Sequence, residues 1–161
     1  MSRLAALVVI DIVVVVVLSI GMGATAPRWP ARWFTRDPFP LHLWSWETSR
    51  YFRRVGTRWF ARRLPELGAA FGGQSKAALP GSSVTELEGY LTEVRRAEWV
   101  HWAAIATCFL LFFFNPWWLA LVFLVGVFLG NLPFILILRN NRRRLLAIVE
   151  RAANSSEGRH P

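Results

Sequence analysis

Two long apolar blocks, residues 4–26 and 99–138, most constrain how this chain of 161 residues can fold. The first block has the length of one membrane span, because about 20 apolar residues in a helix cross a bilayer core of about 30 Å. The second block is nearly twice as long, and Asn115-Pro116 divides it, since proline cannot continue the helix that precedes it. The pattern predicts an all-α integral membrane protein with three transmembrane helices. One is an N-terminal span at residues 4–26, and a C-terminal helical hairpin forms the other two, at 97–114 and 117–138.

The first block also has one feature of a cleaved signal peptide. Ala24-Thr25-Ala26 resembles a cleavage site. However, Pro27 directly after this site would hinder cleavage, and only Arg3 charges the region before the block. A retained span is therefore favoured over a cleaved one, and both readings stay open.

The positive charges predict the orientation in the membrane. The chain has a formal net charge of +9, and its basic residues are almost all arginine, a bias typical of GC-rich bacterial genomes. Arginines next to spans favour the cytoplasmic side. With three spans, the groups that follow span one, precede span two and follow span three share one side: Arg28, Arg32, Arg36, Arg95, Arg96, Arg139, Arg142, Arg143 and Arg144. We therefore expect a multi-pass protein of the bacterial cell membrane, with its N-terminus outside and its C-terminus in the cytoplasm.

Residues 27–96 are predicted to form an amphipathic segment at the cytoplasmic membrane interface. Tryptophan, phenylalanine and arginine alternate in it, a composition that suits the surface of an anionic membrane. Membrane lipids, or a phosphate-bearing cofactor such as coenzyme A, match this charge better than nucleic acid, which we do not expect as a partner. Ser82 or Ser83 is expected to cap a helix that begins at Val84. Residues 139–161 form a basic cytoplasmic tail, and the whole chain 1–161 is expected to be a single membrane domain of unknown oligomeric state.

The sequence predicts neither an intrachain disulfide nor a metal site. Cys108 is the sole cysteine, and His42, His101 and His160 are scattered without the spacing of zinc ligands.

One stretch, "EVRRAEWVHW" at residues 93–102, carries ionisable groups into the edge of the second apolar block. Arg95, Glu98 and His101 recur at every third position, which places them on one broad helix face. If the hairpin turns near Pro116, His101 lies at the depth of Asn131. Ionisable groups in a membrane are costly, so we expect a functional cluster just inside the cytoplasmic face.

A purely structural reading of the same residues stays open. Glu98 can pair with Arg95 on its own helix, His101 can anchor the helix at the headgroups, and Asn131 can hold two helices together. The same hairpin register sets Glu93 level with Arg139. Asp11, on the other side of the bilayer, is expected to bond a serine or a backbone group of a neighbouring helix.

"EVRRAEWVHW", together with the later "NLPFILILRNNRRRL", resembles the glycosyl-4,4'-diaponeurosporenoate acyltransferases, small bacterial membrane proteins of staphyloxanthin-type carotenoid synthesis. The family pattern reads roughly E-T-x-R-A-E-x-x-H-W, then N-x-P, then Q-R-Y-N-R-x-R-L. The chain departs from it at Val94, Leu138 and Asn140. The resemblance covers about residues 45–150 and includes Trp46-Glu47 more loosely. The matching positions are Glu93, Arg96, Ala97, Glu98, His101, Trp102, Asn131, Pro133, Arg139, Asn141, Arg142, Arg144 and Leu145.

The resemblance implies transfer of a fatty acyl group to a sugar hydroxyl of a lipid glycoside. The donor would be a thioester co-substrate, acyl-CoA or an acyl carrier, with no permanently bound cofactor. His101 is the expected base, because an imidazole titrates near neutral pH, and Glu98 would orient it or be the base itself. The expected substrate-binding residues, which hold the carrier, face the oxyanion or contact the acceptor, are Arg95, Asn131, Arg139, Asn141, Arg142 and Glu47.

Two alternatives remain. One is a non-catalytic membrane scaffold or lipid-binding subunit, which the basic amphipathic segment would also suit. The other is an acyltransferase for another glycolipid.

Overall fold

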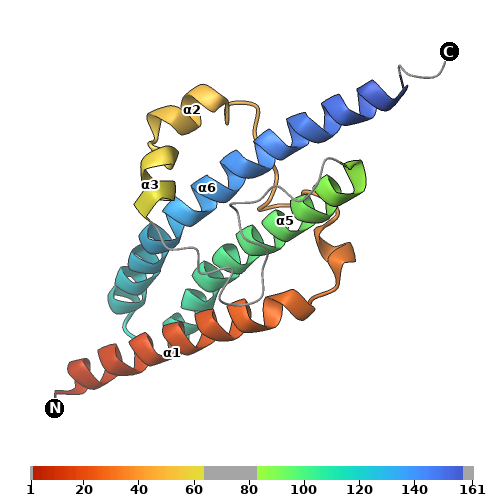
Figure 1. Ribbon diagram of the computed structural model, residues 1–161. Helices are drawn as coiled ribbons and strands as arrows, with labels where there is room; N and C mark the ends of the chain where they lie inside the picture. Colours follow the sequence, from red (N-terminus) through yellow and green to blue (C-terminus); the bar gives the residue numbers. More distant parts are fainter. Residues whose placement is uncertain (1, 64–82, 158–161) are drawn as a thin grey trace.

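Three long helices dominate the computed structural model, which describes residues 2–63 and 83–157. They are α1 (Arg3–Thr25), α5 (Val84–Thr107) and α6 (Trp117–Glu157), arranged as Figure 1 shows. Two short helices, α2 (Ser49–Arg54) and α3 (Thr57–Arg63), lie beside α6, and the 3₁₀ turns are η1 (Ala26–Arg28), η2 (Ala31–Phe34) and η3 (Cys108–Phe113). The described residues contain no strand, which confirms the predicted all-α class. The predicted interfacial segment and basic tail include residues 64–82 and 158–161, which lie outside the described residues.

Helix α5 begins where the sequence predicts. The Ser83 side chain accepts a hydrogen bond from the Glu86 backbone N–H, and the Glu86 carboxylate accepts one from the Ser83 N–H, which is a complete capping box. Ser83 is therefore the cap. The helix then runs without interruption past residue 97, the predicted start of the second span.

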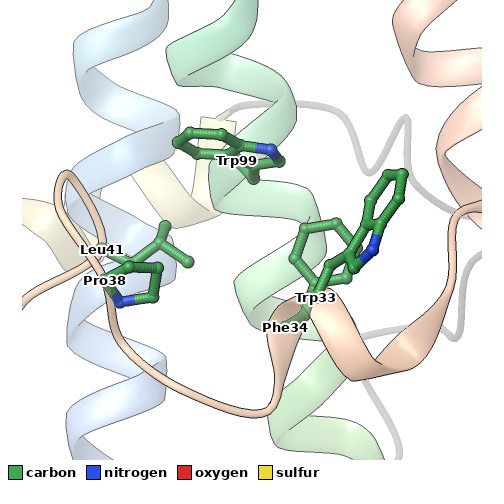
Figure 2. Close-up of a pocket in the computed structure, with 5 residues that line it drawn as sticks. All are labelled: Trp33, Phe34, Pro38, Leu41 and Trp99. Atoms are coloured by element: carbon green, nitrogen blue, oxygen red, sulfur yellow. The ribbon is translucent and has the colours of Figure 1, made fainter.

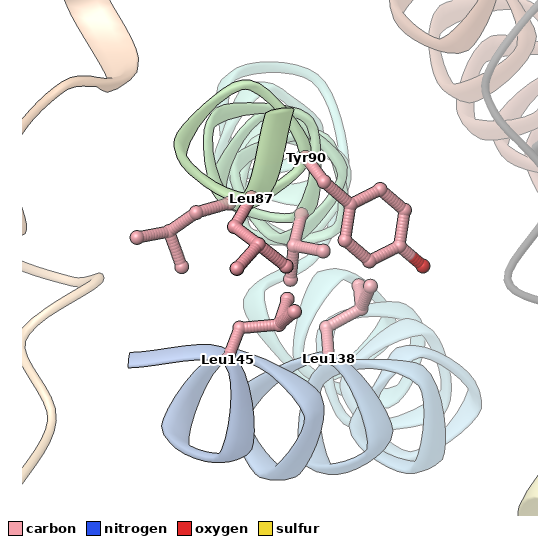
Figure 3. Close-up of a cluster of buried hydrophobic side chains, with 6 residues drawn as sticks. Leu87, Tyr90, Leu138 and Leu145 are labelled. Atoms are coloured by element: carbon pink, nitrogen blue, oxygen red, sulfur yellow. The ribbon is translucent and has the colours of Figure 1, made fainter. Parts of the chain in front are cut away.

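Helices α5 and α6 form an antiparallel hairpin through η3 and Asn115-Pro116. Its apolar core lies at the end of the hairpin away from η3 and contains Leu87, Tyr90, Leu91, Val94, Leu138 and Leu145 (Figure 3). Helix α6 continues through Pro133 and well beyond residue 138, so most of the predicted tail is helical.

Helices α1 and α6 are the two described helices that are long and apolar enough to cross a membrane. Their outer faces are apolar and exposed, as at Val17 on α1 and Val122 on α6, and such faces suit contact with lipid. The chain at residues 97–114 changes from α-helix to the 3₁₀ turn η3 after Thr107. A third span there, the multi-pass topology and the orientation of the termini stay predictions.

Asp11 joins α1 to the tip of the hairpin. It is the buried residue of α1, and its Oδ1 accepts a hydrogen bond of 2.8 Å from Asn115 Nδ2. The expectation of a serine or backbone partner was therefore wrong, since the partner is a side-chain amide. A polar pair inside an apolar helix packing fixes which face of α1 contacts the hairpin.

Candidate functional site

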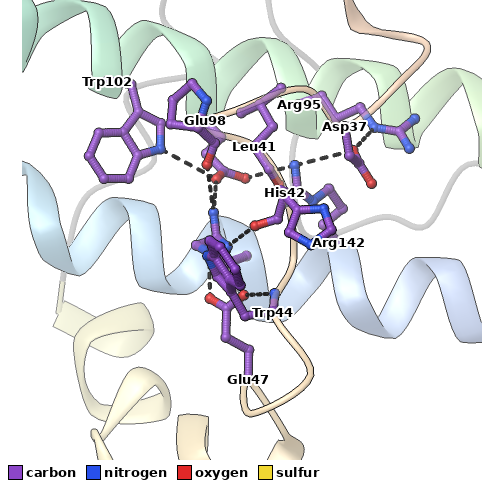
Figure 4. Close-up of polar contacts among 11 residues, drawn as sticks. Asp37, Leu41, His42, Trp44, Glu47, Arg95, Glu98, Trp102 and Arg142 are labelled. Carbon is purple, nitrogen blue, oxygen red and sulfur yellow. Dashed lines mark hydrogen bonds and ion pairs between the residues drawn. The ribbon is translucent and has the colours of Figure 1, made fainter.

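The loop between η2 and α2, residues 35–48, lies across the α5–α6 hairpin (Figure 4). The Arg139 side chain of α6 holds it there. A guanidinium has five N–H donors, and here each has an acceptor. Nε and Nη2 donate to the two carboxylate oxygens of Glu47 at 2.5 and 2.7 Å. Nη1 donates to Glu98 at 2.8 Å and to the Pro40 carbonyl at 3.1 Å, and Nη2 donates also to the His42 carbonyl. Arg139 therefore has no donor left for a ligand.

Arg142, one helical turn later on α6, is fully buried and lies between two carboxylates. Its Nη1 is 3.1 Å from Glu98 Oε2 and 3.4 Å from Asp37 Oδ1, and its Nη2 donates to the Leu41 carbonyl. Asp37 also accepts a hydrogen bond of 2.5 Å from Arg95 Nε. The loop thus supplies acids and carbonyls, and the two helices supply guanidinium groups.

Glu98 is the centre of this arrangement and has no exposed surface. Its carboxylate is clamped by Arg139 and Arg142, and Trp102 Nε1 lies at 3.5 Å from Oε1 (Figure 4). Four arginines and four carboxylates form ion pairs on α5, on α6 and in the loop, and we call them the ion-pair network: Arg95, Arg96, Arg139, Arg142, Asp37, Glu47, Glu93 and Glu98. Buried charges are tolerated only when paired in this way.

Arg96, also on α5, makes an ion pair that is separate from those around Glu98. It pairs with Glu93 on its own helix, and its Nη2 donates to the Trp29 carbonyl at 3.2 Å. The carboxylates that contact Arg139 come from Glu98 and Glu47, and the expected depth match of Glu93 and Arg139 stays a prediction.

His101 follows Glu98 by one turn of α5 and faces α6. Its Nδ1 lies 2.7 Å from Asn131 Oδ1, and its ring stacks on Phe134 with centroids 5.0 Å apart and planes 11° apart. This contact confirms the predicted depth match of His101 and Asn131. Both side chains are half-buried.

The contacts of Asn131 assign the protons of the imidazole. Asn131 Nδ2 donates to the Val127 carbonyl at 2.8 Å, so its amide oxygen is the atom that faces His101. An amide oxygen only accepts, and therefore Nδ1 of His101 carries the hydrogen. In the neutral ring, Nε2 then bears the lone pair that a general base needs.

The structure splits the cluster that the sequence predicts. His101 and Asn131 are together, but Glu98 turns toward the arginines, so Asn131 and not Glu98 is the residue that contacts the imidazole nitrogen. Arg95, Arg139, Arg142 and Glu47 come together in the ion-pair network. Asn141 is half-buried on α6, and its side chain makes none of the hydrogen bonds or ion pairs found among the described residues.

An apolar pocket of about 320 Å³ opens beside the network (Figure 2). It is lined by Trp33 and Phe34 of η2, Pro38 and Leu41 of the loop, and Trp99 of α5. The carbonyl of Leu41 is the one that Arg142 binds, so the network also fixes one wall of this pocket.

The sequence did not single out Asp37. It pairs with Arg95 and approaches Arg142 from the loop. A signal was present, because Asp37 and Glu47 are the only two acids in the arginine-rich stretch from residue 28 to residue 63. Isolated acids among apolar and basic residues are candidates for buried pairs.

One of three comparisons with known proteins finds a match. A family model described as glycosyl-4,4'-diaponeurosporenoate acyltransferase matches residues 30–151. No curated protein and no solved structure matches the chain. The matched range includes the loop, both helices of the hairpin, the ion-pair network and the His101–Asn131 pair, and it excludes α1. The chain therefore belongs to the glycosyl-4,4'-diaponeurosporenoate acyltransferase family, as its motifs predicted.

Proposed function

We propose that the protein transfers a fatty acyl group from a thioester donor to a sugar hydroxyl of a glycosyl carotenoid or a similar lipid glycoside, with His101 as the general base. The observation that carries the proposal is the 2.7 Å contact between His101 Nδ1 and Asn131 Oδ1. It leaves the lone pair on Nε2 of a half-buried imidazole. The family description names the acyl transfer and the class of acceptor.

The proposed reaction needs one base, and its atoms and protons balance without a further catalytic group. Nε2 of His101 removes the proton of the sugar hydroxyl as its oxygen attacks the thioester carbonyl carbon. The tetrahedral intermediate collapses, the C–S bond breaks, and the imidazolium returns the proton to the leaving thiolate. The products are an ester of the lipid glycoside and a free thiol, and direct attack of this kind needs no acyl-enzyme.

In this proposal the ion-pair network positions the site rather than binding substrate. Arg139 donates all of its N–H groups to Glu47, Glu98 and the loop at residues 35–48, and the fully buried Arg142 pairs with Glu98 and donates to the Leu41 carbonyl of the same loop. They fix the loop against the hairpin one turn away from His101. The apolar pocket that the loop helps to form has the lining needed for part of a hydrocarbon chain of a substrate.

The proposal is tested with the full-length protein in phosphatidylcholine nanodiscs, supplied with palmitoyl-CoA and a glycosyl carotenoid. Mass spectrometry of the extracted lipids measures the acylated product. His101→Ala should lower turnover by about 100-fold or more, because a positioned base typically contributes that much. His42→Ala is the matched control, since His42 is exposed and gives the network only its backbone carbonyl. Near-normal turnover of His101→Ala would contradict the catalytic role and favour a scaffold.

A further inference from the structure

The arginines of α2 and α3 differ from those of the ion-pair network. Four of them line a hollow of about 430 Å³, together with Gly56 and Trp59: Arg53, Arg58, Arg62 and Arg63. Their side chains are exposed. No carboxylate of residues 2–63 or 83–157 forms an ion pair with any of them. The hollow therefore gathers positive charge that the described part of the chain does not neutralise.

The hollow has a defined shape. Gly56 has φ +77°, a left-handed conformation that glycine adopts without strain, and it turns the chain between the two arginine-bearing helices. Thr57 is buried and its hydroxyl donates to the Phe52 carbonyl at 3.0 Å, which fixes the turn. Arg63 lies over the Trp59 ring at 4.1 Å, and this cation–π contact holds its guanidinium in place.

The hollow is also tied to the candidate site. Helix α3 packs against α6, the helix that carries Asn131, and Figure 1 shows α2 and α3 beside it. Phe52 of α2 is almost fully buried, and Arg143 of α6 donates to the Ser49 hydroxyl at the start of α2. The position of the hollow along α6 is therefore fixed by packing and by a hydrogen bond.

We propose that this hollow binds the phosphate groups of the acyl thioester donor. Arginine forks match phosphate oxygens with two parallel hydrogen bonds, and several together neutralise a multiply charged group. Arg139 has no donor to spare, and Arg95 and Arg142 are buried and paired with acids. We therefore assign the carrier-binding role expected of these three arginines to the exposed α2–α3 arginines instead. The identity of the ligand as the donor rests on the proposed function, whereas the phosphate site rests on the hollow itself.

The test measures binding rather than turnover, so a failure of the His101 mechanism does not decide it. Coenzyme A is titrated by calorimetry against the full-length protein in nanodiscs of phosphatidylcholine alone. Arg58→Gln combined with Arg62→Gln should raise the Kd by about tenfold or more, since charge-assisted hydrogen bonds are lost. Arg32→Gln combined with Arg36→Gln removes the same charge from exposed sites outside the hollow and should change the Kd less than about twofold.

Further arms identify the source of the phosphate. Inorganic pyrophosphate should compete with coenzyme A for the wild-type protein, and it should compete less well for the hollow variant. Native mass spectrometry counts the phosphatidylglycerol molecules retained from mixed nanodiscs. Equal coenzyme A affinity in the hollow and control variants would overturn the proposal. Loss of phosphatidylglycerol alone, with coenzyme A binding intact, would also overturn it and assign the hollow to a lipid headgroup.

Discussion

Arg139 Nη1 and Glu98 Oε1 are joined by a 2.8 Å hydrogen bond across the α5–α6 hairpin, with both side chains almost completely buried. This pair links the two helices, and through Glu47 it also holds the loop that covers them. Glu98 is therefore an anion that the fold needs, and this requirement separates its role from that of His101.

Glu98→Ala should destabilise the protein by about 3–5 kcal/mol, because it leaves two buried guanidinium groups without their shared carboxylate. Thermal unfolding of the purified protein in detergent measures this effect. His101→Ala is the comparison, and it should change the Tm much less, since His101 is half-buried and lies outside the network. A Glu98→Ala protein with an unchanged Tm but no turnover would instead make Glu98 the base.

Arg139→Lys should cost about 2 kcal/mol or more, although it keeps the charge. Lysine has three donors and no planar fork, so it cannot satisfy the five acceptors that Arg139 binds. Arg144→Lys is the control at an exposed position of the same helix. Equal unfolding midpoints for the two variants would show that the five contacts do not contribute to stability.

Asp11→Asn should keep the link between α1 and the hairpin tip, because an amide oxygen can accept the same hydrogen bond from Asn115. Asp11→Leu should lose it and cost about 1 kcal/mol, the usual scale of interhelical hydrogen bonds in membranes. Unfolding of both variants in mixed micelles compares them. If Asp11→Leu is as stable as Asp11→Asn, the 2.8 Å hydrogen bond between Asn115 and Asp11 does not stabilise the protein.

The arginine distribution predicts an outside N-terminus and a cytoplasmic C-terminus. Single cysteines are introduced at Ser2 and at the exposed Asn154, in a background in which Cys108 is replaced by alanine. A membrane-impermeant maleimide applied to intact cells should label position 2 alone. Labelling of position 154 from outside would reverse the orientation and place the ion-pair network on the outer face.

Local features of the sequence were enough to predict the helical class, the start of α5 and the hairpin. The capping serine, the proline after Asn115 and the length of the apolar runs each act over a few residues. The depth match of His101 and Asn131 followed from counting along the two arms of the hairpin. These features are short-range, so they need no knowledge of the rest of the chain.

The partners of Glu98 could not be predicted in the same way. Arg139 and Arg142, which contact Glu98, also contact Glu47 and Asp37 of a loop that lies more than 30 residues before α5, and no periodicity indicates where such a loop packs. The long side chain of Arg139 reaches carboxylates on two different segments, Glu98 and Glu47, and a depth match along the hairpin does not by itself predict such contacts. The hollow between α2 and α3 was predicted as an interfacial surface, because its concave shape depends on the turn at Gly56.

In the proposed mechanism Asn131 acts through His101, and a double-mutant cycle on turnover measures this coupling. The four proteins are wild type, Asn131→Ala, His101→Ala and the double variant, each assayed by mass spectrometry of acylated lipid in matched nanodiscs. We expect Asn131→Ala to lower turnover by about tenfold in the wild-type background and to have almost no further effect once His101 is alanine. The same tenfold loss in both backgrounds would contradict it, because Asn131 would then act independently of the imidazole.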